Sequence, residues 1–259
     1  AHPLAFQHLP LFHQCALDGT ITPAEVTVGQ GDYKWDVAPS MTAVNEPDTF
    51  TLEMGDDVEQ YEVEYCMVDN IKIAGTIPQD GSAAPVTGEF SYFGRQITVT
   101  GFTASQAVHT SLEYMNAKLS RLYLDTAWAG LGTTEQASTL RGFELELLGE
   151  PALTEPKWYG SANRYFDSYG EGALGAMLAL DLEGNATADA IFDLCKAGTE
   201  RALRFRILGS TIAAGVAYEY QANLFGYFAE VVPLNQFVGA NSLHRALFVA
   251  KPDSSGNML

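Results

Sequence analysis

Apolar and polar residues alternate with a period of two along much of this chain, which is the pattern of β-strands with one buried and one solvated face. A strand at residues 61–67 has Glu62 and Glu64 on its polar face, and its apolar face consists of Tyr61, Val63, Tyr65 and Met67. Residues 143–147 and 178–183 repeat the pattern, with polar faces that carry Glu144, Glu146, Asp181 and Glu183. Further strands are predicted at Phe50–Met54, Asn70–Ala74, Phe90–Thr100, Leu119–Asp125, Leu203–Leu208, Tyr218–Phe228 and Leu243–Ala250. The sequence therefore predicts a mainly β, mostly antiparallel protein.

Two short segments have helical spacing instead. Residues 11–15 form an apolar stripe that ends before Gly19. Residues 191–195 form a similar stripe between Thr187, the expected N-cap, and Gly198, the expected stop. We therefore expect one helix near the N-terminus and one in the second half of the chain.

The elements around these helices follow a similar order. Each predicted helix is followed by a strand, a glycine turn at Gly55 or Gly209, and then a long strand. This order predicts an internal duplication. We expect a first domain at 1–125, which lacks its N-terminal strands, and a second domain at 126–259.

Charge restricts what the chain can bind. The 259 residues contain 14 Lys and Arg against 32 Asp and Glu, a net charge of −18. Residues 1–100 hold fifteen of the acids against Lys34, Lys72 and Arg95, so they carry two thirds of the excess. Such a chain repels a polyanion such as DNA. Its longest apolar stretches are shorter than the about 18 residues of a membrane-spanning helix, so no membrane contact is expected.

Residues that could carry chemistry have simpler explanations. Gly170–Gly175 fits the dinucleotide pattern GxGxxG but leads into a predicted strand, which favours a loop. His13 and Cys15 lie two apart on a helix and face different directions, so we expect a surface histidine and a core cysteine. A group of acids at residues 56–64 lacks the spacing of a calcium-binding loop, which favours a solvated turn and strand face; its members are Asp56, Asp57, Glu59, Glu62 and Glu64. Loose binding of a divalent cation between subunits is the alternative for these acids. No catalytic, cofactor-binding or metal-binding residue is predicted.

Several segments follow one another in a recognisable order. In the second half they are Thr139–Leu147, Pro156–Tyr159, Met177–Glu183 and Lys196–Arg204, and in the first half they are Tyr33–Ala43, Pro47–Leu52 and Tyr61–Cys66. This order of strand, long loop, strand, helix and strand resembles the tail tube (major tail) proteins of phages with long, non-contractile tails. The segments together cover most of the chain, and none of them specifies catalytic chemistry.

The resemblance implies a fold and a function. The fold would be tandem tail-tube-like β-sandwich domains, each with one flanking helix, that join their neighbours into a ring with a central β-barrel. The function would be a structural virion protein, not an enzyme, that self-assembles into stacked rings and forms the channel for DNA delivery. Two domains in one chain imply trimeric rings with pseudo-six-fold symmetry, and hexameric rings stay the alternative. Its partners would be further copies of itself and tail proteins such as the tape measure and the terminator. DNA would pass through the lumen without specific binding, and the particle would assemble in the host cytoplasm without a cofactor.

Two sets of residues are the candidates for these roles. The acids predicted to face the lumen are Glu62, Glu64, Glu144, Glu146, Asp181 and Glu183. Outward-facing acids that keep the particle in solution fit the same pattern. The long Pro151–Gly172 segment is predicted to contact the adjacent ring through Trp158, Tyr159, Tyr165, Phe166 and Tyr169. The rival hypothesis is a carbohydrate-binding β-sandwich on a virion or cell surface, which would use Trp158, Tyr159 and Tyr165.

Overall fold

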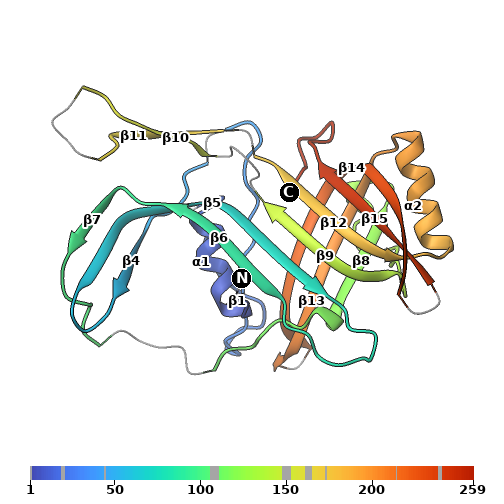
Figure 1. The fold of residues 1–259 in the computed structure, drawn as a ribbon, viewed down its shortest axis with the longest axis horizontal. Coiled ribbons are helices and arrows are strands. Elements are labelled where there is room, and N and C mark those ends of the chain that lie inside the picture. The colour runs from blue at the N-terminus through green and yellow to red at the C-terminus, as the bar shows by residue number, and fades with distance from the viewer. Residues whose placement is uncertain are drawn as a thin grey trace.

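One antiparallel sheet of eleven strands forms most of the structure, which is a computed structural model (Figure 1). It describes residues 2–18, 21–43, 45–105, 111–147, 153–160, 165–172, 174–213, 215–238 and 241–259. The main path is β1-β6-β5-β9-β12-β15-β14-β13-β8, and β4 and β7 both pair with β5. This arrangement confirms the prediction of a mainly β, antiparallel protein.

The bounds of the elements agree closely with the alternating segments of the sequence. The sheet consists of β1 (His2–Pro3), β4 (Phe50–Gly55), β5 (Gln60–Thr76), β6 (Thr87–Phe93), β7 (Gln96–Val99), β8 (Ser120–Asp125), β9 (Leu140–Leu147), β12 (Ala176–Glu183), β13 (Arg201–Ala213), β14 (Val216–Val238) and β15 (Asn241–Ala250). Two small separate sheets consist of β2 (Ala24–Glu25) with β3 (Tyr33–Lys34) and of β10 (Leu153–Lys157) with β11 (Ser168–Glu171). The helices are α1 (Leu9–Gln14), α2 (Ala186–Ala197) and the 3₁₀ turns η1 (Phe6–His8), η2 (Ala117–Leu119) and η3 (Trp128–Gly130).

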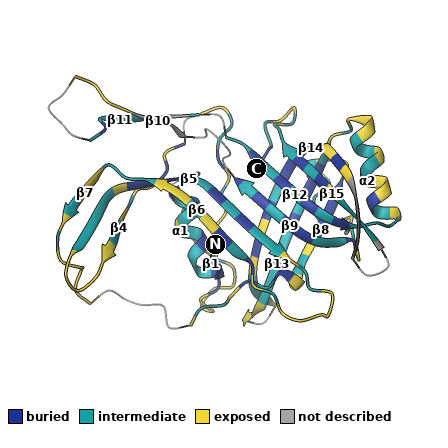
Figure 2. Cartoon of the chain, in the orientation of Figure 1, coloured by how far each residue is buried: buried dark blue, intermediate teal, exposed yellow. Residues whose placement is uncertain are grey.

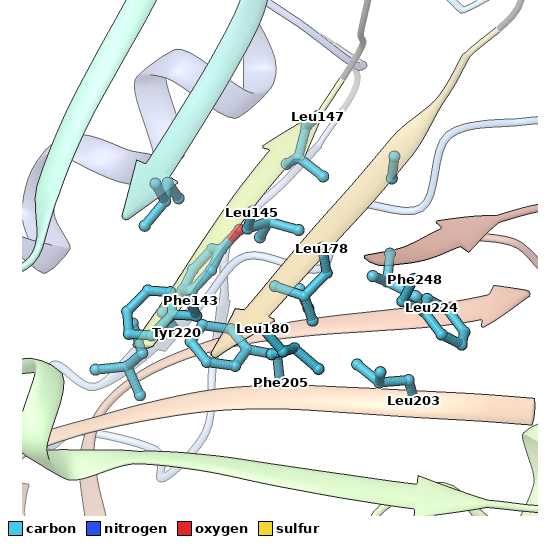
Figure 3. Packing of buried hydrophobic residues seen from close by; sticks show 14 of the residues in the cluster. Phe143, Leu145, Leu147, Leu178, Leu180, Leu203, Phe205, Tyr220, Leu224 and Phe248 are labelled. Atoms are coloured by element: carbon cyan, nitrogen blue, oxygen red, sulfur yellow. The ribbon is translucent and has the colours of Figure 1, made fainter. Parts of the chain in front are cut away.

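The core lies inside the fold of this sheet, between strands that are distant along its path. The predicted alternation holds at residues 143–147 of β9, where the odd positions are buried, and throughout β12, where the even positions are buried (Figure 2). Phe143 of β9 meets Phe205 of β13, with ring centroids 4.4 Å apart (Figure 3). Apolar burial of this kind is the main stabilising contribution to the fold.

Both halves of the chain contribute to this core. It combines residues from Leu4 near the N-terminus to Phe248 of β15. The sheet is also continuous across the predicted boundary, because β5 pairs with β9 and β8 pairs with β13. The division into domains 1–125 and 126–259 stays a prediction.

Helix α2 begins two residues earlier than its sequence pattern indicates. Its N-cap is Asn185, whose side chain accepts hydrogen bonds from the backbone N–H groups of Thr187 and Ala188. The expected cap, Thr187, is therefore wrong, since Asn185 satisfies the free N–H groups first. Gly198 ends the helix in a left-handed conformation with φ of 60°, as predicted.

Helix α1 packs its histidine into the core, so the expected surface histidine is wrong. His13 is buried, and its Nδ1 donates to the carbonyl oxygen of Leu9 at 2.8 Å. The Tyr220 hydroxyl lies 3.4 Å from Nε2, so it can donate a hydrogen bond to this nitrogen of the neutral ring. Burial lowers the pKa of His13. Cys15, the expected core cysteine, is buried.

A β-bulge divides β5 into two parts. Phe50 of β4 lies opposite Cys66 and Leu52 lies opposite Val63, so two residues of β5 face one residue of β4. Tyr65, in the bulge, has a φ of 56°. The prediction that Tyr61, Val63, Tyr65 and Met67 share one face is therefore wrong beyond Val63. The extra residue shifts the alternation of side chains between the two faces by one position.

Two turns also differ from their predictions. The single strand expected at 90–100 is interrupted between β6 and β7 at Gly94, where a Cβ atom would lie 2.3 Å from Val63 Cγ1. The glycine turn expected at Gly209 is wrong, because Gly209 lies within β13. The turn to β14 instead uses Gly215, with φ of 86°.

Candidate assembly surfaces

Four of the six predicted lumen acids share one face of the central sheet. In β9 and β12 the buried side chains alternate with the acids, which places the acids on the face opposite the core. The register places Glu144 beside Ala179 and Glu146 beside Met177. We call this surface the outer face; its acids are Glu144, Glu146, Asp181 and Glu183.

Each of these acids has a polar partner on a neighbouring strand. The pairs are Lys72 Nζ with Glu144 Oε1 at 3.0 Å, Asn70 Nδ2 with Glu146 Oε1 at 2.7 Å, Arg245 Nη1 with Asp181 Oδ1 at 4.0 Å, and Arg141 Nε with Glu183 Oε2 at 2.6 Å. The hydrogen bond to Glu144 raises the pKa of Lys72. The four acids and three cations of these pairs leave only one net negative charge.

Glu62 and Glu64 lie elsewhere. They belong to a three-stranded projection that we call the arm: β4, residues 60–64 of β5, and β7. Both acids line an open cleft of about 480 Å³ together with Arg95 and Tyr165. Glu64 accepts a hydrogen bond from the hydroxyl of Thr98 at 2.9 Å. The structure therefore does not bring the six predicted acids into one surface.

The long 151–172 segment contains a β-hairpin rather than an irregular loop. Strands β10 and β11 pair with each other and form a sheet separate from the main one. Residues 151–152 and 161–164 lie outside the described part of the chain. Figure 1 shows the hairpin standing off from the body. Trp158 and Tyr159, two of its predicted contact residues, are 61% and 62% exposed.

The other predicted contact residues lie nearer to the body. Phe166 is buried and packs edge-on against Phe93, with centroids 5.7 Å apart. Arg95 Nε donates to the Phe166 carbonyl oxygen at 3.0 Å, and its guanidinium lies 4.7 Å from the ring centre of Tyr165. Tyr169 is half-buried. Phe166 and Tyr165 thus attach the hairpin to the body, while Trp158 and Tyr159 remain open to a partner.

Sequence reasoning missed Arg95 as the anchor of this hairpin. One feature of the sequence could have indicated this role. Arg95 is the only Lys or Arg between Lys72 and Lys118, and it lies close to aromatic residues in the sequence. Its partners come from 70 residues further along the chain, and no local pattern indicates such a contact.

The edge of β8 is covered by the loop that follows it, which the sequence also did not reveal. Asp125 accepts hydrogen bonds from the backbone N–H groups of Gly132, Thr133 and Thr134 and from the Thr133 hydroxyl. Burial acts to raise the pKa of Asp125, but these hydrogen bonds together outweigh it and lower the pKa. The loop then pairs with β8 through the Leu124 N–H and the Leu122 carbonyl. A covered edge cannot recruit another strand.

The described residues lack two kinds of feature. They contain no cluster of three or more His, Cys, Asp or Glu side chains that could hold a metal ion. None of the helices that the structure describes is long and apolar enough to cross a membrane.

Comparison with known proteins gives little further information. No protein-family model matches the sequence, and no curated protein matches it. Among solved structures, a chain of the SPP1 tail tube, determined by solid-state NMR and cryo-EM, is similar with a TM-score of 0.35 and 13% identity. The similarity covers 51% of this chain and 73% of that chain. Similarity at this level does not assign the chain to a family.

Proposed function

We propose that this chain is a structural subunit of a phage tail tube, which self-assembles into stacked rings and lines the channel for DNA delivery. It acts by assembly rather than by catalysis. The order of its sequence segments supports this role, as does the antiparallel sheet that those segments form. The subunit then belongs to the virion tail and contacts the tape measure and terminator proteins at the ends of the tube.

The observation that carries the proposal is the β10–β11 hairpin. An isolated two-stranded hairpin is marginally stable in water. This hairpin is attached to the body through Phe166 and Arg95, but it leaves Trp158 and Tyr159 mostly exposed. Exposed aromatic side chains of this kind are typical anchors of protein interfaces. The hairpin therefore suits a contact between one ring and the next.

The number of chains in each ring follows from the proposed duplication. If each chain supplies two tube domains, three chains close a ring of six domains, with the sheets of neighbours forming the central β-barrel. Closed cyclic symmetry also removes the sheet edges that invite aggregation. The acids of the outer face are the best candidates for the channel wall. Together with their cation partners they carry a small net negative charge, which would not bind DNA.

The test replaces both exposed aromatics of the hairpin, Trp158→Ser with Tyr159→Ser. We expect the double variant to form single rings but few tubes in electron micrographs, because the contact between rings is lost. Val28→Ser is the matched control, since Val28 is 89% exposed and lies between β2 and β3. Tubes of normal length in the double variant would contradict the proposed contact.

The exposed Trp158 and Tyr159 also fit a carbohydrate-binding module, which is the second candidate function. Exposed aromatic rings can stack on a sugar ring as well as on a protein. The same double variant separates the two functions. A module would stay monomeric and lose glycan binding, whereas a tube subunit would lose tube growth.

A further inference from the structure

The arm is a β-sheet with no core beneath it. None of the residues in β4, in residues 60–64 of β5 or in β7 is buried, and Figure 2 shows only intermediate and exposed residues there. Three strands need a packed apolar face to be stable on their own. Within the described chain, the arm therefore lacks the packing that its strands require.

One face of the arm is apolar throughout. The register places Tyr61 opposite Val99 and Met54, and Val63 opposite Ile97 and Leu52. Because cross-strand partners point to the same side of a sheet, these residues share one face. We call it the arm face; its members are Leu52, Met54, Tyr61, Val63, Ile97 and Val99. Ile97 is 69% exposed and Val99 is 66% exposed.

The size of the arm face indicates a partial interface. Three strands spaced by about 4.8 Å and five residues of about 3.3 Å each give roughly 240 Å². A stable interface buries about 800 Å² on each partner. The arm face can therefore supply about a third of one contact, which suits a subunit that touches its neighbour at several places.

Charge indicates which surface covers the arm face. The tip of the arm, between β4 and β5, carries Asp56, Asp57 and Glu59, and all three are exposed. A mostly cationic strip runs over η2, β8 and β13; it consists of Lys118, Arg121, Arg204 and Arg206. The acids near it are Glu135 and Glu219, which form ion pairs with Arg121 and Arg206, and Asp80, which lies near Lys118. The strip therefore keeps an excess of positive charge in a protein that is otherwise strongly acidic.

A second feature of the strip favours an anionic partner. Arg206 and Arg121 lie directly opposite each other in the β13–β8 ladder. Like charges in opposed positions destabilise a sheet. Glu219 forms a close pair with Arg206 at 2.5 Å, but Glu135 lies 3.4 Å from Arg121. Both arginines are thus paired, but Arg204 Nε donates to the neutral Asn223 Oδ1 at 2.8 Å, so acids from another molecule would add a charged partner there.

The two surfaces cannot meet within one chain. Figure 1 shows the arm at one end of the long axis, while β8, β13 and α2 lie in the other half of the molecule. Complementary surfaces at separate places on identical subunits give a head-to-tail contact, which closes into a ring when the rotation permits. We propose that the arm face and the acidic arm tip dock onto the β8–β13 side of a second copy of this chain. This inference rests on the proposed function and names the contact within one ring.

The first test replaces two exposed members of the arm face, Ile97→Thr with Val99→Thr. Threonine keeps a high strand propensity, so the arm should stay folded. We expect the concentration needed for ring assembly to rise about tenfold or more, because two apolar side chains no longer gain from burial. Val28→Thr makes the same kind of change at an exposed site outside the arm and should leave assembly unchanged. Circular dichroism of each variant checks that the fold persists.

The second test locates the contact directly. Rings are assembled from equal amounts of unlabelled and nitrogen-15-labelled chains and treated with a carbodiimide, which joins a carboxylate to an amine in direct contact. We expect cross-links of mixed isotope composition between the arm tip, residues 56–59, and Lys118. Rings that form without such cross-links would overturn the inference.

The outcomes separate this inference from the function on which it rests. If the wild-type chain forms no rings, both fail. If the Ile97→Thr, Val99→Thr variant forms rings as well as the wild type does, the inference alone fails and the tail-tube function stands. If that variant forms rings but no longer joins another tail protein, the arm face belongs to that partner, and the inference is likewise overturned.

Discussion

Neutralising two acids of the outer face should make the channel retain DNA. Glu144→Gln with Asp181→Asn removes the carboxylates that accompany Lys72 at 3.0 Å and Arg245 at 4.0 Å. The seven charged groups of the outer-face pairs then change from one net negative charge to one net positive charge in each chain. Both pairs are partly exposed, so the free energy of unfolding should fall by no more than about 1 kcal/mol per pair. The fold should therefore persist.

The magnitude follows from counterion release. Each cation that contacts a phosphate adds about 0.9 to the slope of log K against log salt concentration. Lys72 keeps Glu89 opposite it, so between one and two cations are freed; the slope is about 0.9–1.8, which is roughly a three- to twelvefold gain in DNA affinity for a fourfold decrease in salt. We expect particles that carry this variant to assemble but to eject DNA slowly, and most slowly at low salt.

The assay measures the rate of DNA ejection over a range of salt concentrations. Asp193→Asn is the control, because it frees Lys196 on α2, 3.6 Å away, through the same kind of substitution, with half of the change in charge. Ejection at the wild-type rate at every salt concentration would show that the outer face does not line the channel. The reasoning about the channel wall would then be refuted, although the assembly itself could still stand.

Three further predictions concern stability and assembly. Asp125→Ala should lower the free energy of unfolding by about 1–3 kcal/mol, because four donors of the covering loop lose the charged acceptor that holds the loop to β8. Since the pKa of Asp125 is lowered in the folded chain, this loss should be complete above pH 3.8 and shrink as the pH falls further; denaturant titrations at several pH values check it. The folded chain takes up a proton at His13 less readily than the unfolded chain does, so wild-type stability should fall as the pH decreases below 6.5, and His13→Gln should remove part of that fall in the same titrations. An isolated ring should have the mass of three 28.0-kDa chains by native mass spectrometry; six chains would show that one half of the chain is not a tube domain.

The strands were predictable because each buries one face. Positions such as Leu178, Leu180 and Leu182 alternate with polar residues, and a period of two indicates a strand wherever the other face is solvated. The helix stop at Gly198 was predictable for a similar reason, since glycine is the residue that most easily adopts a left-handed conformation. Local chemistry was enough in both cases.

The bulge at Tyr65 was not predictable from that pattern. Its sequence continues the alternation of Tyr61 and Val63, and only the pairing with β4 shows that one residue is extra. His13 is a second example, because its burial depends on Tyr220, which is 207 residues away. Contacts between distant segments leave no periodic signal in the sequence.

The candidate surfaces were predictable in part. The alternation placed Glu144 and Asp181 on a polar face, but it could not show that Lys72 and Arg245 from other strands accompany them. For the same reason, the apolar face of the arm follows only from the register of three strands. The exposed position of Trp158 was expected from its long polar segment, whereas the hairpin that holds it was not.

Electron microscopy of the purified protein tests the central claim most directly. The account predicts rings with a central lumen at moderate protein concentration, and tubes of stacked rings at higher concentration. Class averages viewed along the axis should show six similar lobes contributed by three chains. A protein that stays monomeric at every concentration, without rings or tubes, would contradict the account.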